Sequence, residues 1–267
     1  MEVTIKSLGI LSVATNIYLE YWKSQAASVA KFADPSMEVT LHIFTDQPEA
    51  AEEFGKSLGN VKVVGHRIPA YRWPEATLYR YRIFNAAREQ LTQDVLMYLD
   101  ADMLWHRTVG QGDLATSNGA GVTLVQHPGY YRPSFVRQLA LYAKRPKLLL
   151  SDLYSRLTLG GLGAWETSEA SQACVPREKR SAYFCGGTWW GYRDAVLDLV
   201  AELDHNVTKD EMAGVMAKWH DESHINWWGA NHPHATKNPS FCYSVSYPWI
   251  HHLPMIIQAV DKDEATR

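Results

Sequence analysis

The run Val95–Leu99 is hydrophobic at every position, so both faces of the strand that it forms must be buried. Burial on both faces is typical of a parallel sheet with helices on its two sides. Asp100-Ala101-Asp102 follows this run directly. Two carboxylates at a strand end are costly unless a cation meets them, and ligands of open α/β sheets bind at this edge. The triplet predicts a divalent metal that carries a phosphorylated ligand, with a simple polar turn as the alternative.

Strand-like and helix-like patterns alternate through the first hundred residues. We expect strands at 8–15, 38–44, 61–64 and 95–99, and helices at 16–32, 50–58 and 75–91. This alternation predicts a doubly wound, mostly parallel α/β sheet flanked by helices. The sequence contains no GxGxxG motif and no P-loop motif, so a metal rather than glycine amides would neutralise a bound diphosphate.

The second half is less regular in pattern. We expect helices at 132–159, 193–203 and 208–219, loops at 160–163 and 167–179, and a strand at 183–185. No repeat or linker separates the halves, so a single domain of residues 1–267 is expected.

Composition excludes several classes of protein. The net charge is −3 without a basic tract, which argues against nucleic acid as a partner. The three cysteines lack CxxC spacing, which argues against a disulfide scaffold and a zinc site. Neither a signal peptide nor an apolar run of membrane-spanning length occurs, so a soluble cytoplasmic protein is expected. The 10 Trp and 14 Tyr suit the faces of sugars, although they also serve ordinary cores.

The segment 219–226, Trp-His-Asp-Glu-Ser-His-Ile-Asn, gathers two acids, two histidines and a tryptophan. His220 and His224 have helical zinc-ligand spacing, but Glu222 does not stand where the HExxH geometry requires it. A helix start capped by Asp221 or Ser223 is the simpler alternative. Glycosyl transfer would use the cluster directly, since a carboxylate at the anomeric carbon can act as nucleophile or stabilise an oxocarbenium-like transition state.

Several motifs together resemble glycosyltransferase family 6, which includes the histo-blood-group ABO transferases and α-1,3-galactosyltransferase. The resemblance runs from about Leu8 to Pro239. It is carried, in chain order, by Phe44-Thr45-Asp46-Gln47-Pro48, Asp100-Ala101-Asp102-Met103, His127-Pro128-Gly129-Tyr130-Tyr131, Gly186-Gly187 and the segment 219–226.

This resemblance implies a GT-A fold, with a nucleotide-binding half at 1–105 and an acceptor-binding half at 106–267. It implies retaining transfer of galactose or N-acetylgalactosamine from a UDP-sugar to a galactose-terminated oligosaccharide or glycolipid, in α-1,3 linkage. Mn²⁺ or another divalent cation such as Mg²⁺ is the implied cofactor, bound by Asp100 and Asp102. Donor-binding positions, including those around the metal, would be Val13, Ala14, Thr15, Tyr18, Arg80, Asp100, Ala101, Asp102, Cys185, Gly186, Gly187 and Asp221.

Glu222 is the implied catalytic carboxylate and, with His127 and Trp219, an acceptor-binding residue. Covalent and front-side retaining mechanisms both stay open. Simpler roles are the alternatives at four positions: a solvated helix face for Arg80, a core residue for Tyr18, a structural turn for His127, and a tight turn or strand bulge for Gly186-Gly187.

The triplet Cys185-Gly186-Gly187 matches the family position that sets donor choice. Its small side chains leave room for an N-acetyl group and favour UDP-GalNAc over UDP-Gal. The missing anchor suggests a bacterial or phage-encoded member. Segment 132–163 is longer than in mammalian relatives, and a lid or an acceptor platform would fit it. At the C-terminus, Lys262 or Arg267 could fold over the diphosphate, or the terminus could fray.

Two other classes of protein remain open. A nucleotide-sugar hydrolase or pyrophosphorylase would use the same acids without a sugar acceptor. A Trp-rich, non-catalytic sugar-binding module would need neither metal nor UDP.

Overall fold

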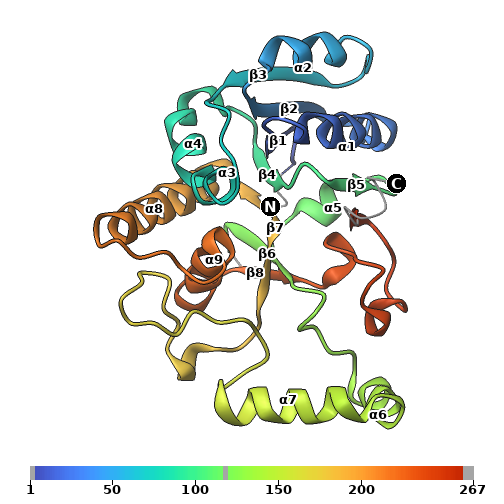
Figure 1. Cartoon of the computed structure of the whole chain (residues 1–267). Helices are drawn as coiled ribbons and strands as arrows, with labels where there is room; N and C mark the ends of the chain where they lie inside the picture. Colours follow the sequence, from blue (N-terminus) through green and yellow to red (C-terminus); the bar gives the residue numbers. More distant parts are fainter. Residues whose placement is uncertain (1–3, 117–119, 261–267) are drawn as a thin grey trace.

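The protein contains a central seven-stranded sheet with the strand order β3-β2-β1-β4-β7-β6-β8 (Figure 1). The computed structural model describes residues 4–116 and 120–260. Lys262 and Arg267 therefore lie outside the described residues. The strands of the main sheet are β1 (Ser7–Val13), β2 (Glu38–Thr45), β3 (Lys62–Arg67), β4 (Val95–Leu99), β6 (Val122–Gln126), β7 (Phe184–Tyr192) and β8 (Ala235–Lys237). A small second sheet pairs β5 (Met103–Trp105) with β9 (Ile257–Ala259).

Most neighbouring strands of the main sheet are parallel, and β7 alone runs antiparallel to its neighbours β4 and β6. The expected α/β class, with a mostly parallel sheet flanked by helices as in a GT-A-like fold, is confirmed. The sheet takes strands from both proposed halves, and the division at residue 105 stays a prediction.

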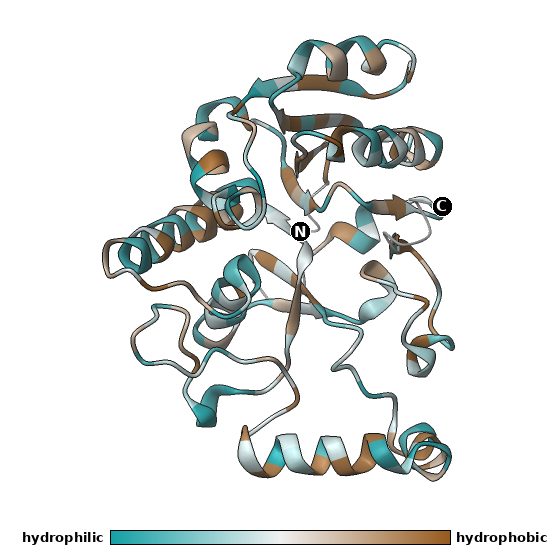
Figure 2. Cartoon of the chain, in the orientation of Figure 1, coloured by the Kyte–Doolittle hydropathy of each residue, from teal (hydrophilic) through white to brown (hydrophobic). Residues whose placement is uncertain are grey.

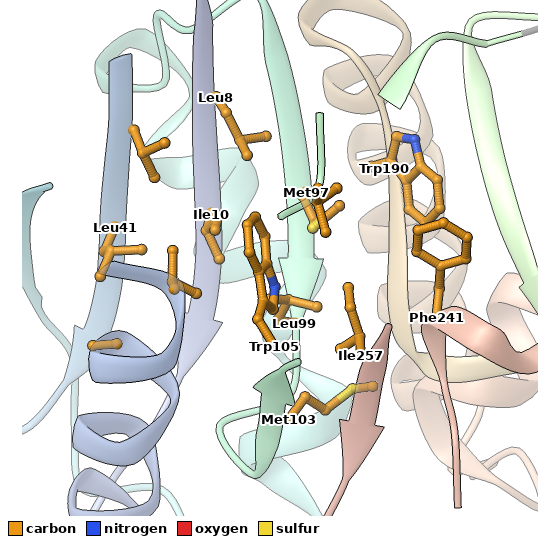
Figure 3. Packing of buried hydrophobic residues seen from close by; sticks show 14 of the residues in the cluster. Leu8, Ile10, Leu41, Met97, Leu99, Met103, Trp105, Trp190, Phe241 and Ile257 are labelled. Atoms are coloured by element: carbon orange, nitrogen blue, oxygen red, sulfur yellow. The ribbon is translucent and has the colours of Figure 1, made fainter. Parts of the chain in front are cut away.

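The strands β1 and β4 are buried on both faces, as their apolar runs predicted. Leu8, Ile10, Met97 and Leu99 face one core cluster, in which they pack near Trp105 and Ile257 (Figure 3). The alternate residues of the same strands face a second cluster. Because successive side chains of a strand point to opposite faces, one uninterrupted apolar run supplies both cores.

Helices on each face complete these cores. Helices α1 (Tyr18–Phe32) and α2 (Pro48–Gly55) contribute to the first cluster, and α1 does so through apolar residues at helical spacing. Helices α4 (Arg80–Ala86), α8 (Arg193–Met212) and α9 (His220–Asn231) contribute to the second. The remaining helical elements are α3 (Glu75–Leu78), η1 (Arg88–Gln90), α5 (Gln111–Leu114), α6 (Phe135–Lys144), α7 (Pro146–Thr158), η2 (Arg177–Lys179), η3 (Pro239–Phe241) and η4 (Pro248–Ile250).

Three expected helices were wrong in extent. The segment 75–91 is divided into α3, α4 and η1, and 132–159 is divided at Arg145, which precedes Pro146 and has a non-helical backbone with φ of −137° and ψ of 68°. The helix expected at 208–219 is the end of α8, which stops at Met212 before Gly214, a residue with φ of 68°. Strands β5, β6, β8 and β9 had no counterpart among the expected elements, because strands of three to five residues show too little periodicity.

Helices α6 and α7 lie at the end of the molecule opposite β3 and α2 (Figure 1). Hydrophobic residues occur along both helices, although they lie at the periphery (Figure 2). None of the helices within residues 4–116 and 120–260 is both long and apolar enough to cross a membrane.

Candidate active site

The ends of β1 and β4 open into a cavity of about 480 Å³. The two strands are parallel neighbours, so Val13 and Asp100 leave the sheet at the same edge. The expected donor-binding residues Val13, Thr15, Tyr18, Arg80, Asp100, Ala101 and Asp102 all line this cavity. Ala14 is buried beside them and is not part of the lining. The structure thus brings together side chains from three separate parts of the first hundred residues.

Arg80 connects the two acidic motifs of the sequence. Its guanidinium group lies 3.2 Å from Asp100 Oδ1 and 3.0 Å from Asp221 Oδ2, and only 3% of its side chain is exposed. The guanidinium also packs over the ring of Tyr98 at 4.4 Å. Burial disfavours its charge, but the field of Asp221, aided by Asp100, outweighs this effect and raises the pKa of Arg80. The solvated helix face that was the alternative for Arg80 is therefore wrong.

The catalytic candidate Glu222 is held at both of its carboxylate oxygens. Tyr183 donates its hydroxyl proton to Oε1 at 2.9 Å, and the backbone N–H of Gly186 donates to Oε2 at 2.9 Å. Burial raises the pKa of Glu222 to about 7, against the opposing effect of these two hydrogen bonds. Burial likewise raises the pKa of the adjacent Asp221, while Arg80 acts in the opposite direction. A carboxylate with fixed orientation and a pKa near neutrality is typical of catalytic sites.

A second cavity, of about 210 Å³, connects Glu222 with the first one. Trp73, Thr77, Arg80 and Asp100 line both cavities. The lining of the smaller cavity continues with Gly186, Gly187, Trp219, His220, Asp221 and Glu222. Asp100 therefore stands between a larger compartment at the ends of β1 and β4 and a smaller compartment at Glu222.

Gly186 and Gly187 allow the acids to approach β7 closely. A Cβ atom at Gly186 would lie 2.8 Å from Asp221 Oδ2, and one at Gly187 would lie 2.9 Å from Asp100 Oδ2. The register of the β6–β7 pairing shifts here, which is compatible with the strand bulge considered as an alternative. The positions of Asp221 and Asp100 therefore require glycine at 186 and 187, whether or not these two residues also contact a ligand.

Cys185 is not brought to either cavity. Its side chain is 4% exposed, belongs to the first core cluster and contacts the thiol of Cys242. Its position in the core offers no direct contact with a donor in the two cavities, and its assignment as a donor-binding residue stays a prediction.

The two acceptor candidates differ in their surroundings. Trp219 is 48% exposed and lines the smaller cavity. His127 lies among aromatic rings: the centre of its ring is 5.9 Å from that of Tyr183 and 6.2 Å from that of Tyr247. Burial lowers the pKa of His127 to about 4. Its Nδ1 accepts the backbone N–H of Gly129 at 3.0 Å, so a structural role in the turn is present. The ring of Tyr183, which donates to Glu222, lies between His127 and this carboxylate in the network of contacts.

Ser223 and His224 of the segment 219–226 are not among the residues that line the smaller cavity. Helix α9 begins after Trp219, which makes no side-chain capping hydrogen bond, so the alternative of a helix start capped by Asp221 or Ser223 is wrong. Ser223 Oγ, from inside the helix, instead accepts the backbone N–H of Trp219 at 2.9 Å. His224 is fully buried and lies 3.6 Å from Asp210, away from the carboxylates of the site. No group of three or more His, Cys, Asp or Glu side chains within residues 4–116 and 120–260 is arranged to hold a metal alone.

Asp100 and Asp102 fit a cation that completes its ligand set from a bound molecule. Four carboxylates line the two cavities, at positions 100, 102, 221 and 222, against the guanidinium groups of Arg72 and Arg80. Mg²⁺-like cations are commonly held by one or two carboxylates together with phosphate oxygens and water. The donor set therefore suits a divalent cation that arrives with a diphosphate.

Sequence reasoning missed several residues of the site. Tyr71, Arg72 and Trp73 line the larger cavity, and Tyr98 and Tyr183 donate hydrogen bonds to Asp100 and Glu222. For the first three residues the sequence did contain a signal, because the segment 71–74, Tyr-Arg-Trp-Pro, places two aromatic residues and an arginine together just before α3. Tyr98 and Tyr183 had none, because a tyrosine in a hydrophobic run is indistinguishable from a core residue.

Comparison with known proteins agrees with this geometry. The sequence model of glycosyltransferase family 6 matches residues 163–266. Histo-blood group ABO system transferase 1 of Rattus norvegicus is 26% identical over 91% of this chain and 61% of its own length. Globoside alpha-1,3-N-acetylgalactosaminyltransferase 1 of Homo sapiens is 24% identical over 96% of this chain and 67% of its own. Alpha-1,3-galactosyltransferase 2 of Homo sapiens is 23% identical over 89% of this chain and 63% of its own length.

The chain spans about three fifths of the length of most of these relatives. The match to the family model lies in the C-terminal part and includes Cys185, Gly186, Gly187 and the segment 219–226. The similarity to whole relatives extends over about nine tenths of the chain. The resemblance of this chain to glycosyltransferase family 6 is thereby confirmed.

Proposed function

We propose that this chain is a retaining hexosyltransferase that moves N-acetylgalactosamine or galactose from a UDP-sugar to a galactoside in α-1,3 linkage. The observation that carries the proposal is the continuity of the two cavities across Asp100 and Arg80. One compartment offers a carboxylate pair to a metal diphosphate, and the other offers an oriented carboxylate to a sugar. The relatives named as transferases support the same reaction class.

The larger compartment would hold the nucleoside diphosphate. Val13, Thr15 and Tyr18 would contact uracil and ribose, and Tyr18, which is 37% exposed, lines this cavity with them. Asp100 and Asp102 would bind Mn²⁺ or Mg²⁺, which as a Lewis acid would neutralise the charge of the departing diphosphate. Arg80 holds Asp100 in place for this role.

The smaller compartment would hold the transferred sugar. Asp221 would accept hydrogen bonds from sugar hydroxyls, and Glu222 would face the anomeric carbon. In the reaction, the bond from this carbon to the diphosphate oxygen breaks and a bond to the acceptor hydroxyl oxygen forms. The hydroxyl proton leaves with a basic oxygen of the site or of the diphosphate. Glu222, in its ionised form, would either attack the carbon first or stabilise its positive charge.

Donor choice is proposed to favour UDP-GalNAc. The argument is the small bulk of the triplet 185–187, of which Gly186 and Gly187 line the smaller cavity while Cys185 lies in the core. However, a Cβ atom at Gly187 would point towards Asp100, so the absence of a side chain also allows Asp100 to lie close to β7. Trp219 would stack on the acceptor sugar, and His127 would complete the acceptor side through the aromatic cluster around Tyr183.

Calorimetric titration of UDP-GalNAc and UDP-Gal, each with Mn²⁺ and with EDTA, tests the donor half of the proposal. We expect binding that depends on Mn²⁺ and is lost in Asp100→Ala, while Asp198→Ala on the exposed face of α8 serves as the matched control. Binding of UDP that is indifferent to Mn²⁺ would contradict the role of the acid pair.

Product analysis tests the acceptor half. Transfer should require a galactoside acceptor. Equal consumption of the UDP-sugar with and without acceptor would instead indicate a nucleotide-sugar hydrolase. Glycan binding that survives Asp100→Ala, without affinity for UDP, would indicate a sugar-binding module.

A further inference from the structure

The inner side of the hairpin of α6 and α7 combines polar side chains with the partly buried Leu141, Leu148 and Leu149. Asp152 is the only buried residue of the two helices. Its carboxylate accepts two hydrogen bonds from Arg132, at 2.5 and 2.7 Å, and one from the hydroxyl group of Tyr142 at 2.6 Å. Arg177 donates to the backbone carbonyl of Leu157 at 2.6 Å. The bonds of Arg132 and Arg177 thus help to hold the hairpin to the segments before and after it.

The outer side of the hairpin is apolar. On α7, Leu150, Leu153, Tyr154 and Leu157 follow the spacing i, i+3, i+4, i+7, and their exposed fractions lie between 46% and 72%. On α6, Phe135, Val136 and Leu139 are 63–79% exposed. A soluble helix normally turns such a stripe towards the core, whereas this one faces outward in addition to the partly buried leucines of the inner side.

Basic residues accompany these apolar faces. Segment 132–159 contains six basic residues and one acid, the paired Asp152, in a chain whose net charge is −3. Arg137, Lys144 and Arg145 line a cavity of about 380 Å³ between α6 and residues 248–252. Among the described residues that line it, none is acidic. This cavity suits an anionic group such as a phosphate.

We propose that the α6–α7 hairpin docks on the surface of an anionic lipid bilayer. The exposed leucines would enter the boundary between head groups and acyl chains, and the basic residues would meet lipid phosphates. A second copy of the chain is a poorer occupant, because a symmetric contact would bring two strongly basic surfaces together.

Docking would bring the acceptor side of the site near the lipid. The hairpin follows directly on the segment 127–131, whose His127 packs against Tyr183, the hydrogen-bond donor to Glu222. Resting on the proposed function, this geometry favours an acceptor glycan that is carried on a lipid. Vesicle binding is measured without donor or acceptor, so its failure is distinguishable from a failure of the proposed transfer reaction.

Flotation of the full chain with vesicles tests the proposal. We expect binding to vesicles of phosphatidylglycerol and phosphatidylcholine, and little binding to phosphatidylcholine alone or at about 0.5 M salt. The triple change of Leu150, Leu153 and Leu157 to Ser should weaken binding at least about tenfold. The matched control changes three exposed apolar residues elsewhere to Ser, namely Met212, Met216 and Val245.

A second variant tests the charge. Changing Arg137, Lys144 and Arg145 to Gln should weaken binding about fivefold per charge. The matched control changes three exposed lysines of the nucleotide-binding half, Lys31, Lys56 and Lys62, to Gln. Thermal unfolding followed by tryptophan fluorescence confirms that each variant folds.

Three results would overturn the proposal. The first is no binding of the wild-type chain to anionic vesicles. The second is binding that both hairpin variants retain, or that the control variants lose equally. The third is a wild-type dimer in sedimentation velocity that the leucine variant converts to monomer, without vesicle binding, since the apolar face would then cover a second copy.

Discussion

Replacing Glu222 with Gln should make the protein more stable above neutral pH while it removes transfer. Burial raises the pKa of Glu222 from 4.5 to about 7 in the folded protein. Ionisation therefore costs stability, and this cost develops between pH 4.5 and 7 and is complete above pH 7. A shift of this size corresponds to about 3 kcal/mol. Gln keeps the shape, and its oxygen and amide can still serve Gly186 and Tyr183.

The net gain should be smaller than this figure. Glu222 is partly exposed, and exchanging charge-assisted hydrogen bonds for neutral ones costs part of the benefit. We expect the free energy of unfolding to rise by about 1–2 kcal/mol at pH 8 and to be unchanged or lower at pH 5. Transfer should fall at least about a hundredfold at both pH values.

Urea unfolding followed by tryptophan fluorescence at pH 5 and pH 8, with EDTA and without donor, measures this difference. Glu169→Gln, at an exposed position, is the matched control and should change neither quantity. An equal effect of Glu222→Gln on stability at the two pH values would refute the raised pKa. Transfer at the wild-type rate would refute the catalytic role.

Three further substitutions address the rest of the site. Arg80→Met should lower the free energy of unfolding by about 3–5 kcal/mol, because it leaves the buried carboxylate of Asp221 without its ion-pair partner, and should abolish UDP binding in calorimetry. Gly187→Ala should weaken Mn²⁺-dependent UDP binding about tenfold by displacing the first acid of the pair, whereas Gly112→Ala, which has open space around its Cβ position, should not. Tyr183→Phe removes a hydrogen bond that favours the ionised form of Glu222, so the acid limb of the pH–rate profile should move to higher pH. An unchanged limb would indicate that the tyrosine acts only in packing.

Much of the frame was predictable from local pattern. The strands β1, β2 and β4 were expected within one or two residues of their ends, because long apolar runs report burial directly. The acid pair after β4 was expected at a strand end and lies there, in a cavity. Helix continuity was predicted less well. The expected helix 132–159 ignored Pro146, whose ring and missing N–H divide the segment.

The sequence by itself determined the α/β class, the edge of the sheet that carries the site and the acids that stand there, because periodicity and composition are local properties. Only the tertiary structure decided which groups meet. Arg80 and Asp221 are distant in the chain and form one buried ion pair, and Tyr183, directly before β7, and Gly186, within β7, orient Glu222 of helix α9. The local pattern of apolar and polar residues indicates which side chains are buried. It does not indicate which groups pair with a buried charge, because this depends on which helices and strands the fold packs together.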